Sequence, residues 1–139
     1  MMRALFAVLF FLTGPLLLGQ SHIIEMSFSD ASQYPTRVAY EVQNDKGTIL
    51  QQGFIEVANA STYYQVPLDV TKKFAVLVYE DANRNSQMDR GWFTQPLEKY
   101  AFSNNAWVTL AKPELEDMLV PRTGTKTRMV LTFKSVTDF

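Results

Sequence analysis

Hydrophobic and polar residues alternate along most of the chain after residue 22. Ile24, Met26 and Phe28 fall on one side of an extended segment, and polar residues occupy the positions between them. The same alternation recurs over residues 38–42 and 129–133. Because successive side chains of a strand point to opposite faces of a sheet, this period of two predicts strands that each bury one face.

Turn signals separate these predicted strands. The sequence Asn44-Asp45-Lys46-Gly47 leads from the second strand into strand-like residues at 48–57, which predicts a hairpin. Residues 59–61 form a further turn signal before an extended segment at 62–66. The run Phe74–Tyr79 is apolar on both faces, which indicates a central strand.

Helical periodicity is almost confined to residues 113–119. Pro113 lies near the first turn and acidic residues follow it, a pattern that favours a short helix. Several short strands with turn signals between them predict a mainly β fold. We expect a single antiparallel β-sandwich with one long loop segment after the central strand.

Residues 1–21 have the pattern of a secretory signal peptide, with Arg3 ahead of an apolar run that starts at Ala4. A retained membrane anchor is the alternative. However, Gly14-Pro15 interrupts the run, and about 20 apolar residues are needed to cross a bilayer. We therefore expect a β-sandwich domain over residues 22–139 that is secreted, periplasmic or on the cell surface, with no stable membrane span after processing.

Composition excludes several classes of function. The chain has 139 residues, which suits one domain, and a formal net charge of -1 that becomes more acidic once Arg3 is removed. This balance argues against nucleic acid as a partner, because phosphate binding needs clustered positive charge. The chain contains no cysteine, and its single histidine is His22. A cysteine nucleophile, a Ser-His-Asp triad and a histidine-based zinc site are therefore not expected.

Oxygen-bearing side chains fall at every second position after the central strand: Asp81, Asn83, Asn85, Gln87 and Asp89. This is the spacing with which the first nine positions of an EF-hand loop wrap a calcium ion. Gln87 would contribute its backbone carbonyl and the other four their side chains. Trp92 stands where an EF-hand has its bidentate glutamate, and Glu98 is the candidate for that missing carboxylate. The candidate cofactor is therefore Ca2+.

Other residues of this loop weaken the calcium hypothesis. Ser86 occupies the position at which an EF-hand has glycine, and Arg84 and Arg90 add positive charge. The alternative is that the Asp and Asn side chains cap turns by hydrogen bonding to their own backbone. The sequence leaves both interpretations open.

The segment from residue 74 to residue 105 resembles a family of secreted bacterial proteins known as domain of unknown function 2141. In that family a strand leads into an Asp- and Asn-rich loop ending in Asp, followed by Pro-x-Glu and a Tyr-Gly-Phe-Ser-Asn-Asn-like segment. The matching residues are Asp81, Asn83, Asn85, Asp89, Pro96, Glu98, Tyr100, Phe102, Ser103, Asn104 and Asn105. Ala101 departs from the family's glycine. The resemblance implies a secreted, mostly β, immunoglobulin-like or transthyretin-like sandwich, and no known activity.

We expect a non-enzymatic binding or accessory module at the bacterial cell envelope, with an envelope protein or a glycan as its partner. The aromatic residues of this region either line a sugar or peptide site or pin the loop onto the sheet: Trp92, Phe93, Tyr100, Phe102 and Trp107. Two alternatives remain. One is a carbohydrate-active hydrolase that uses Glu98 with an aspartate. The other is a purely structural envelope domain.

Overall fold

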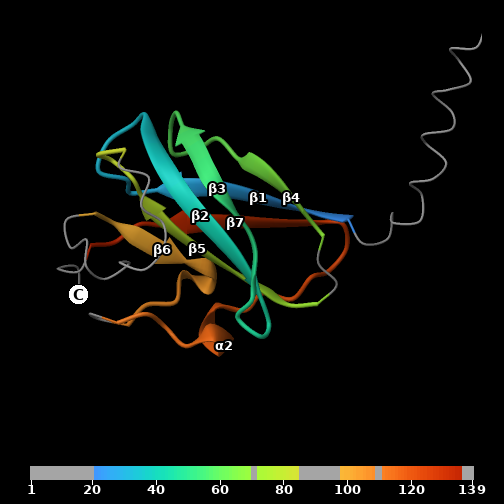
Figure 1. The fold of residues 1–139 in the computed structure, drawn as a ribbon. Helices are drawn as coiled ribbons and strands as arrows, with labels where there is room; N and C mark the ends of the chain where they lie inside the picture. The colour runs from blue at the N-terminus through green and yellow to red at the C-terminus, as the bar shows by residue number, and fades with distance from the viewer. Residues whose placement is uncertain (1–20, 70–71, 85–97, 109–110, 136–139) are drawn as a thin grey trace, which may run out of the picture.

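The computed structural model describes residues 21–69, 72–84, 98–108 and 111–135. They form two packed β-sheets, with a 3-10 turn and one short α-helix beside them (Figure 1). The mainly β, sandwich-like fold predicted from the alternating pattern is confirmed. The proposed signal peptide falls almost wholly on residues outside the described ranges, so that it stays a prediction.

The first sheet has the strand order β4-β1-β7. Its strands are β1 (Ser21–Ser29), β4 (Tyr64–Asp69) and β7 (Lys126–Thr132). β1 pairs antiparallel with β4 but parallel with β7, which departs from a purely antiparallel sandwich. A parallel pair needs a long connection, and here the whole second sheet lies between β1 and β7 in the sequence.

The second sheet has the strand order β3-β2-β5-β6. Its strands are β2 (Thr36–Asn44), β3 (Ile49–Val57), β5 (Phe74–Glu80) and β6 (Tyr100–Phe102). The predicted β2–β3 hairpin and the central strand are confirmed, and every residue of β5 is buried. β6 was expected to be part of the long loop, because a strand of three residues is too short to show alternation.

The turn of the β2–β3 hairpin follows from its residue types. The side-chain oxygen of Asn44 accepts hydrogen bonds from the backbone N–H groups of Lys46 at 2.8 Å and Thr48 at 3.0 Å. Gly47 has a φ of 82°, in the left-handed region that glycine enters without a steric cost. These features fix the register of the hairpin.

The main core lies between the two sheets. Alternate residues of β1, β2, β4, β5 and β7 point into it, and the rings of Phe28 and Phe133 stack at 6.0 Å. Apolar area removed from water stabilises such a core by about 25 cal/mol per Å².

A second, smaller core covers the opposite face of β5 and β6. It includes Leu77, Tyr79 and Met118, and is closed by the 3-10 turn η2 (Ser103–Asn105) and the helix α2 (Leu115–Met118). The short helix expected after Pro113 is thus present. Across the described ranges, no helix is long and apolar enough to cross a membrane.

Candidate functional site

Three of the six predicted metal ligands lie in the part of the chain that the structure describes: Asp81, Asn83 and Glu98. The other three, Asn85, Gln87 and Asp89, lie outside the described residues and stay sequence-based predictions. Asp81 directly follows β5, and Glu98 lies two residues before β6. The ends of these two neighbouring strands therefore position the two carboxylates.

The β5–β6 ladder sets the relation between these carboxylates. Tyr79 pairs with Tyr100, and the ladder continues as the N–H of Glu80 donates to the carbonyl of Lys99 at 2.8 Å. The same antiparallel register places Asp81 opposite Glu98. The negative charge of Asp81 raises the pKa of the Glu98 carboxyl, which agrees with the two carboxylates being neighbours.

Asp81 and Glu98 belong to a row of charged residues that runs across the sheet. The N–H of Asp81 donates to the carbonyl of Arg37 in β2 at 2.7 Å, and Arg37 is the register partner of Glu56 in β3. The charged row is therefore Glu56, Arg37, Asp81 and Glu98. Its single cation lies between Glu56 and Asp81, and two carboxylates stand side by side at its end.

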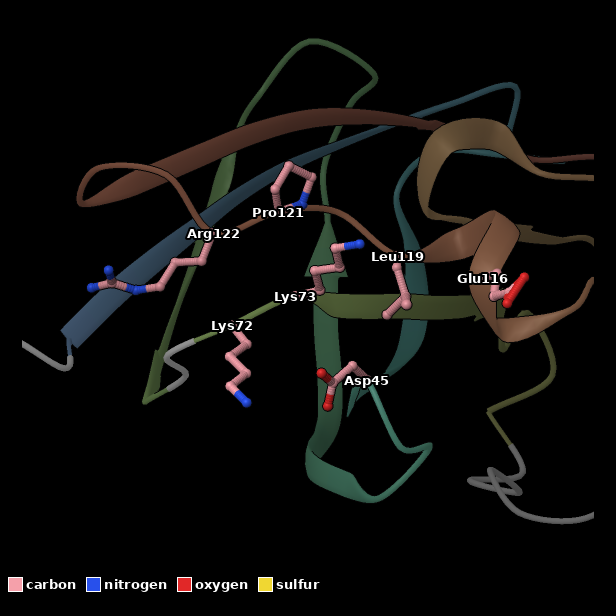
Figure 2. Close-up of a pocket in the computed structure, with 7 residues that line it drawn as sticks. All are labelled: Asp45, Lys72, Lys73, Glu116, Leu119, Pro121 and Arg122. Carbon is pink, nitrogen blue, oxygen red and sulfur yellow. The ribbon is translucent and has the colours of Figure 1, made fainter.

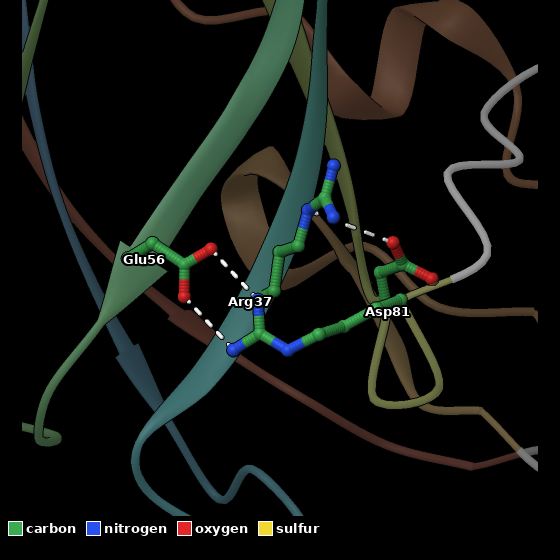
Figure 3. Close-up of polar contacts among 4 residues, drawn as sticks. Arg37, Glu56 and Asp81 are labelled. Atoms are coloured by element: carbon green, nitrogen blue, oxygen red, sulfur yellow. Dashed lines mark hydrogen bonds and ion pairs between the residues drawn. The ribbon is translucent and has the colours of Figure 1, made fainter.

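Burial makes this arrangement electrostatically costly. Asp81 is 0% exposed, and its Oδ2 lies 3.7 Å from the Nε of Arg37 (Figure 3), which is an ion pair longer than a hydrogen bond. Both carboxylate oxygens of Glu98 are buried, and neither makes a hydrogen bond of normal geometry to a described residue.

The pKa of Glu98 reflects its surroundings. Burial and then the negative charge of Asp81 raise this pKa, against a smaller lowering by the backbone N–H of Asn83. The charged form of Glu98 is thus disfavoured in the folded protein. A bound cation, or a proton on Glu98, would relieve the repulsion between Asp81 and Glu98.

Arg84, which was expected to weaken cation binding, has a different partner. Its guanidinium donates two hydrogen bonds to the carboxylate of Glu56, at 2.9 and 3.0 Å. Its backbone N–H donates to the carbonyl of Asp81 at 3.0 Å, and its φ of 54° completes a turn. Much of the positive charge of Arg84 is therefore neutralised by the Glu56 carboxylate of β3.

The described residues do not form a complete metal site by themselves. Among them, no group of three or more His, Cys, Asp or Glu side chains is arranged to hold a metal ion. Asp81 and Glu98 would thus need the further oxygen ligands predicted from the spacing of the loop, since calcium takes six to eight.

Glu80, a second acidic residue at the end of β5, has a structural role. Its buried carboxylate accepts hydrogen bonds from the backbone N–H of Ser32 at 2.9 Å, the Ser32 hydroxyl at 2.8 Å and the Thr36 hydroxyl at 2.8 Å. These bonds hold the loop before β2 against the end of β5. A carboxylate with three such donors is poorly placed to act as a catalytic acid or base.

The Ser-Asn-Asn motif after β6 joins separate parts of the fold. The Ser103 hydroxyl accepts a hydrogen bond from the N–H of Val76 at 2.9 Å and donates one to the carbonyl of Met118 at 2.5 Å. The Asn104 amide donates to the carbonyls of Asp117 at 3.2 Å and Leu119 at 2.9 Å. The motif therefore fastens α2 to the sheet.

The described aromatic residues of this region serve packing. Tyr100 and Phe102 are each 1% exposed, which leaves no ring face for a ligand. Trp107 stacks on Tyr100 at 5.2 Å, and the Lys134 ammonium lies 5.4 Å from its ring. These contacts favour the interpretation that the aromatics pin the segment onto the sheet. Trp92 and Phe93 lie outside the described ranges.

A pocket of about 560 Å³ lies beside Lys73 (Figure 2). Lys73 directly precedes β5, so the pocket is at the end of β5 opposite Asp81. It is lined by Asp45, Lys72, Lys73, Glu116, Leu119, Pro121 and Arg122. Three cations and two carboxylates share this pocket, so that no single charge dominates it. It contains none of the predicted site residues.

Comparison with known proteins agrees with the resemblance carried by the loop and strand residues. No curated protein and no solved structure matches the chain significantly. The family DUF2141, described as uncharacterized proteins conserved in bacteria, matches residues 22–130. This match covers most of the chain, including β1 from His22 onward, β2 to β6, the predicted loop ligands and the Ser-Asn-Asn motif. The chain therefore belongs to the DUF2141 family.

Proposed function

We propose that this protein is a secreted, non-enzymatic binding or accessory module of the bacterial cell envelope, and that a calcium ion stabilises the β5–β6 end of its sandwich. One observation carries the calcium proposal: two buried carboxylates, Asp81 and Glu98, stand opposite each other while the guanidinium beside them lies 3.7 Å from one. Asn83, Asn85, Gln87 and Asp89 supply the remaining oxygens in this proposal.

Calcium suits this position better than magnesium does. Calcium accepts a variable number of carboxylate, amide and carbonyl oxygens in flexible geometry, whereas magnesium demands a near-octahedral set. Ser86 in place of glycine and the cation Arg37 beside Asp81 both reduce affinity. We expect a dissociation constant of about 0.1–1 mM, the range of extracellular calcium modules.

The non-enzymatic assignment rests on how the acidic residues are held. A glycoside hydrolase needs two carboxylates that reach the same sugar. Here Asp81 is fully buried, and the Glu80 carboxylate accepts hydrogen bonds from the hydroxyls of Ser32 and Thr36. The single histidine, His22, is also engaged, with its Nε2 lying 2.6 Å from the Thr127 hydroxyl. The secreted location is supported by the sequence of residues 1–21, and the bacterial origin by family membership.

A purely structural envelope domain is the second candidate. The observation that favours it is the Arg37–Asp81 ion pair, which already supplies Asp81 with one positive charge. In that case the raised pKa of Glu98 favours its neutral form, and no divalent cation is needed.

Thermal unfolding in calcium, in magnesium and in chelator tests the proposal. Calcium is expected to raise the melting temperature of the wild-type protein more than magnesium does, because it binds only the folded state. Asp81→Asn and Glu98→Gln should abolish the calcium shift, whereas Glu114→Gln, an exposed carboxylate elsewhere, should leave it unchanged. A wild-type melting temperature that is the same with and without about 10 mM calcium would leave the structural candidate in place.

A further inference from the structure

The outer strands of the two sheets differ in how well they are protected against pairing with a further strand. An unpaired edge strand presents backbone donors and acceptors to which another strand can add. On β7, the Asn105 side chain accepts a hydrogen bond from the N–H of Thr132 at 3.1 Å and donates one to the carbonyl of Val130 at 3.4 Å. This amide makes the hydrogen bonds that a neighbouring strand would make, so that no further strand can pair with β7 at these residues.

Two other edges are protected by different means. Tyr100 in β6 exchanges two backbone hydrogen bonds with Lys134, at 2.9 and 3.1 Å. β4 contains Pro67, which lies opposite Ile23 of β1 and has no N–H. Proline is accepted in a ladder only where the missing donor would face away from the partner strand. The outer edge of β4 therefore lacks a donor near its middle.

β3 has no comparable protection within the described residues. It is the outer strand of its sheet and nine residues long. A bulge near Leu50 interrupts its pairing with β2, but Gln51–Val57 keep a regular register. The strand contains no proline or lysine. Its one charged residue, Glu56, is bound by the guanidinium of Arg84 through two hydrogen bonds.

Exposed apolar side chains are concentrated on this strand. Of the five large hydrophobic residues exposed in the described ranges, β3 carries Ile49, Leu50 and Phe54. Phe54 is 38% exposed and lies at the middle of the regular part of the strand. The Arg37 guanidinium packs over the Phe54 ring at 4.0 Å, which holds the ring in place.

We propose that β3 pairs antiparallel with β3 of a second copy of this chain, about a twofold axis at Phe54. This register places the two Phe54 rings opposite each other, a favourable cross-strand pair. It also places Gln52 opposite Glu56 of the second copy, where an amide can donate to a carboxylate. Two four-stranded sheets would thereby become one continuous sheet.

A second copy fits this edge for reasons of charge and symmetry. Since Arg84 neutralises Glu56, the two identical edges do not repel each other, whereas a strongly charged partner would find no opposite charge on β3. Because the other three edges are protected, the pairing uses the same edge on both copies and closes at a dimer. The pairing is separate from the calcium proposal, since it uses neither Asp81 nor Glu98.

An introduced cysteine tests the register. The chain has no cysteine of its own, and opposite residues of an antiparallel pair have Cα atoms about 4.5–5.5 Å apart, which a disulfide can bridge. Phe54→Cys is expected to form a covalent dimer under mild oxidation. Val130→Cys, at a residue that is 45% exposed on β7, should stay monomeric. Equal cross-linking of both variants would contradict the proposed register.

Sedimentation of the cysteine-free protein tests the dimer itself. The wild-type protein is expected to dimerise, and Phe54→Lys should raise the dissociation constant by more than about tenfold, because it removes a central aromatic contact and places like charges together. Val130→Lys is the matched control and should sediment like the wild type. A wild-type chain that remains monomeric at about 1 mM, a concentration at which even a dimer with a millimolar dissociation constant would be populated, overturns the proposal.

Discussion

The Nε of Arg37 lies 3.7 Å from the Oδ2 of Asp81, although the Asp81 side chain is entirely buried. Arg37 also packs over Phe54 at 4.0 Å, so that its guanidinium is shared between an aromatic ring and a carboxylate. A strong buried pair would have a shorter, better aligned contact. In the calcium proposal, the bound ion would compete with Arg37 for Asp81.

Replacement of Arg37 should show two effects of this ion pair: its contribution to stability without calcium, and its competition with calcium for Asp81. Without calcium, Arg37→Gln is expected to lower the free energy of unfolding by about 1–3 kcal/mol, because a buried carboxylate loses a cation. With calcium, the gain in melting temperature should be larger than in the wild type, since the competing charge is gone. Calorimetric titration and thermal unfolding measure both effects, and Arg128→Gln, on the other sheet, is the control. An equal calcium response in Arg37→Gln and wild type would contradict competition.

Glu98 predicts a specific dependence on pH. Its pKa is raised in the folded protein by burial and by Asp81, so that the folded state holds this proton more tightly than the unfolded state does. Its contribution to stability is fully present below the unfolded pKa and is lost as the pH rises through the folded pKa. In chemical denaturation without calcium, the free energy of unfolding of Glu98→Gln should therefore fall less over this pH range than that of the wild type.

Over the same pH range, calcium should stabilise the folded protein more strongly as the pH rises. It binds the ionised carboxylates, and its stabilising effect should grow as the pH rises through the folded pKa of Glu98. Thermal unfolding at several pH values, with calcium and with chelator, measures the difference. A calcium effect that is constant across this window would argue against Glu98 as a ligand.

The hydrogen bonds of Glu80 predict a large cost of substitution. Glu80→Gln is expected to lower the free energy of unfolding by about 1.5–3 kcal/mol, because it replaces a charged acceptor of three hydrogen bonds by a neutral amide. The exposed Glu114→Gln should change stability by less than about 0.5 kcal/mol. Urea denaturation compares the two. Similar effects of both substitutions would mean that Glu80 does not anchor the loop before β2.

Asn105 predicts a local effect on β7. Asn105 has a φ of 49°, so that Asn105→Gly removes the amide without adding backbone strain. The free energy of unfolding should fall by about 0.5–1.5 kcal/mol for the lost hydrogen bonds. Hydrogen exchange at the N–H of Thr132 should become faster, because its acceptor is gone. Unchanged exchange there would show that this N–H has another source of protection.

The strands were readily predicted, but the contacts between them were not. Alternation predicted β1, β2 and β7 because apolar side chains of each strand point into the main core while mostly polar ones point the other way, even where, as in β1 and β2, both faces are largely buried. Continuous apolar character predicted β5. Three residues are too few for alternation to reveal β6. Its absence from the predicted sheet also hid the ladder that sets Asp81 opposite Glu98.

The candidate site was predicted in part, for a related reason. Glu98 was named as an extra carboxylate by its chemistry, and the structure does bring it beside Asp81. Arg37 gave no signal, because its position depends on pairing between β2 and β5, which residue types alone do not specify. Glu80 and the Ser-Asn-Asn motif are tied to segments distant in sequence, and such contacts leave no local pattern.

The parallel pairing of β1 with β7 has a consequence for how the chain is made. β1 begins at Ser21 and β7 ends at Thr132, so that β1, the central strand of the first sheet, pairs with a strand about a hundred residues later in the sequence. Contacts of such long sequence separation form slowly. During synthesis, the first sheet stays incomplete until β7 has left the ribosome.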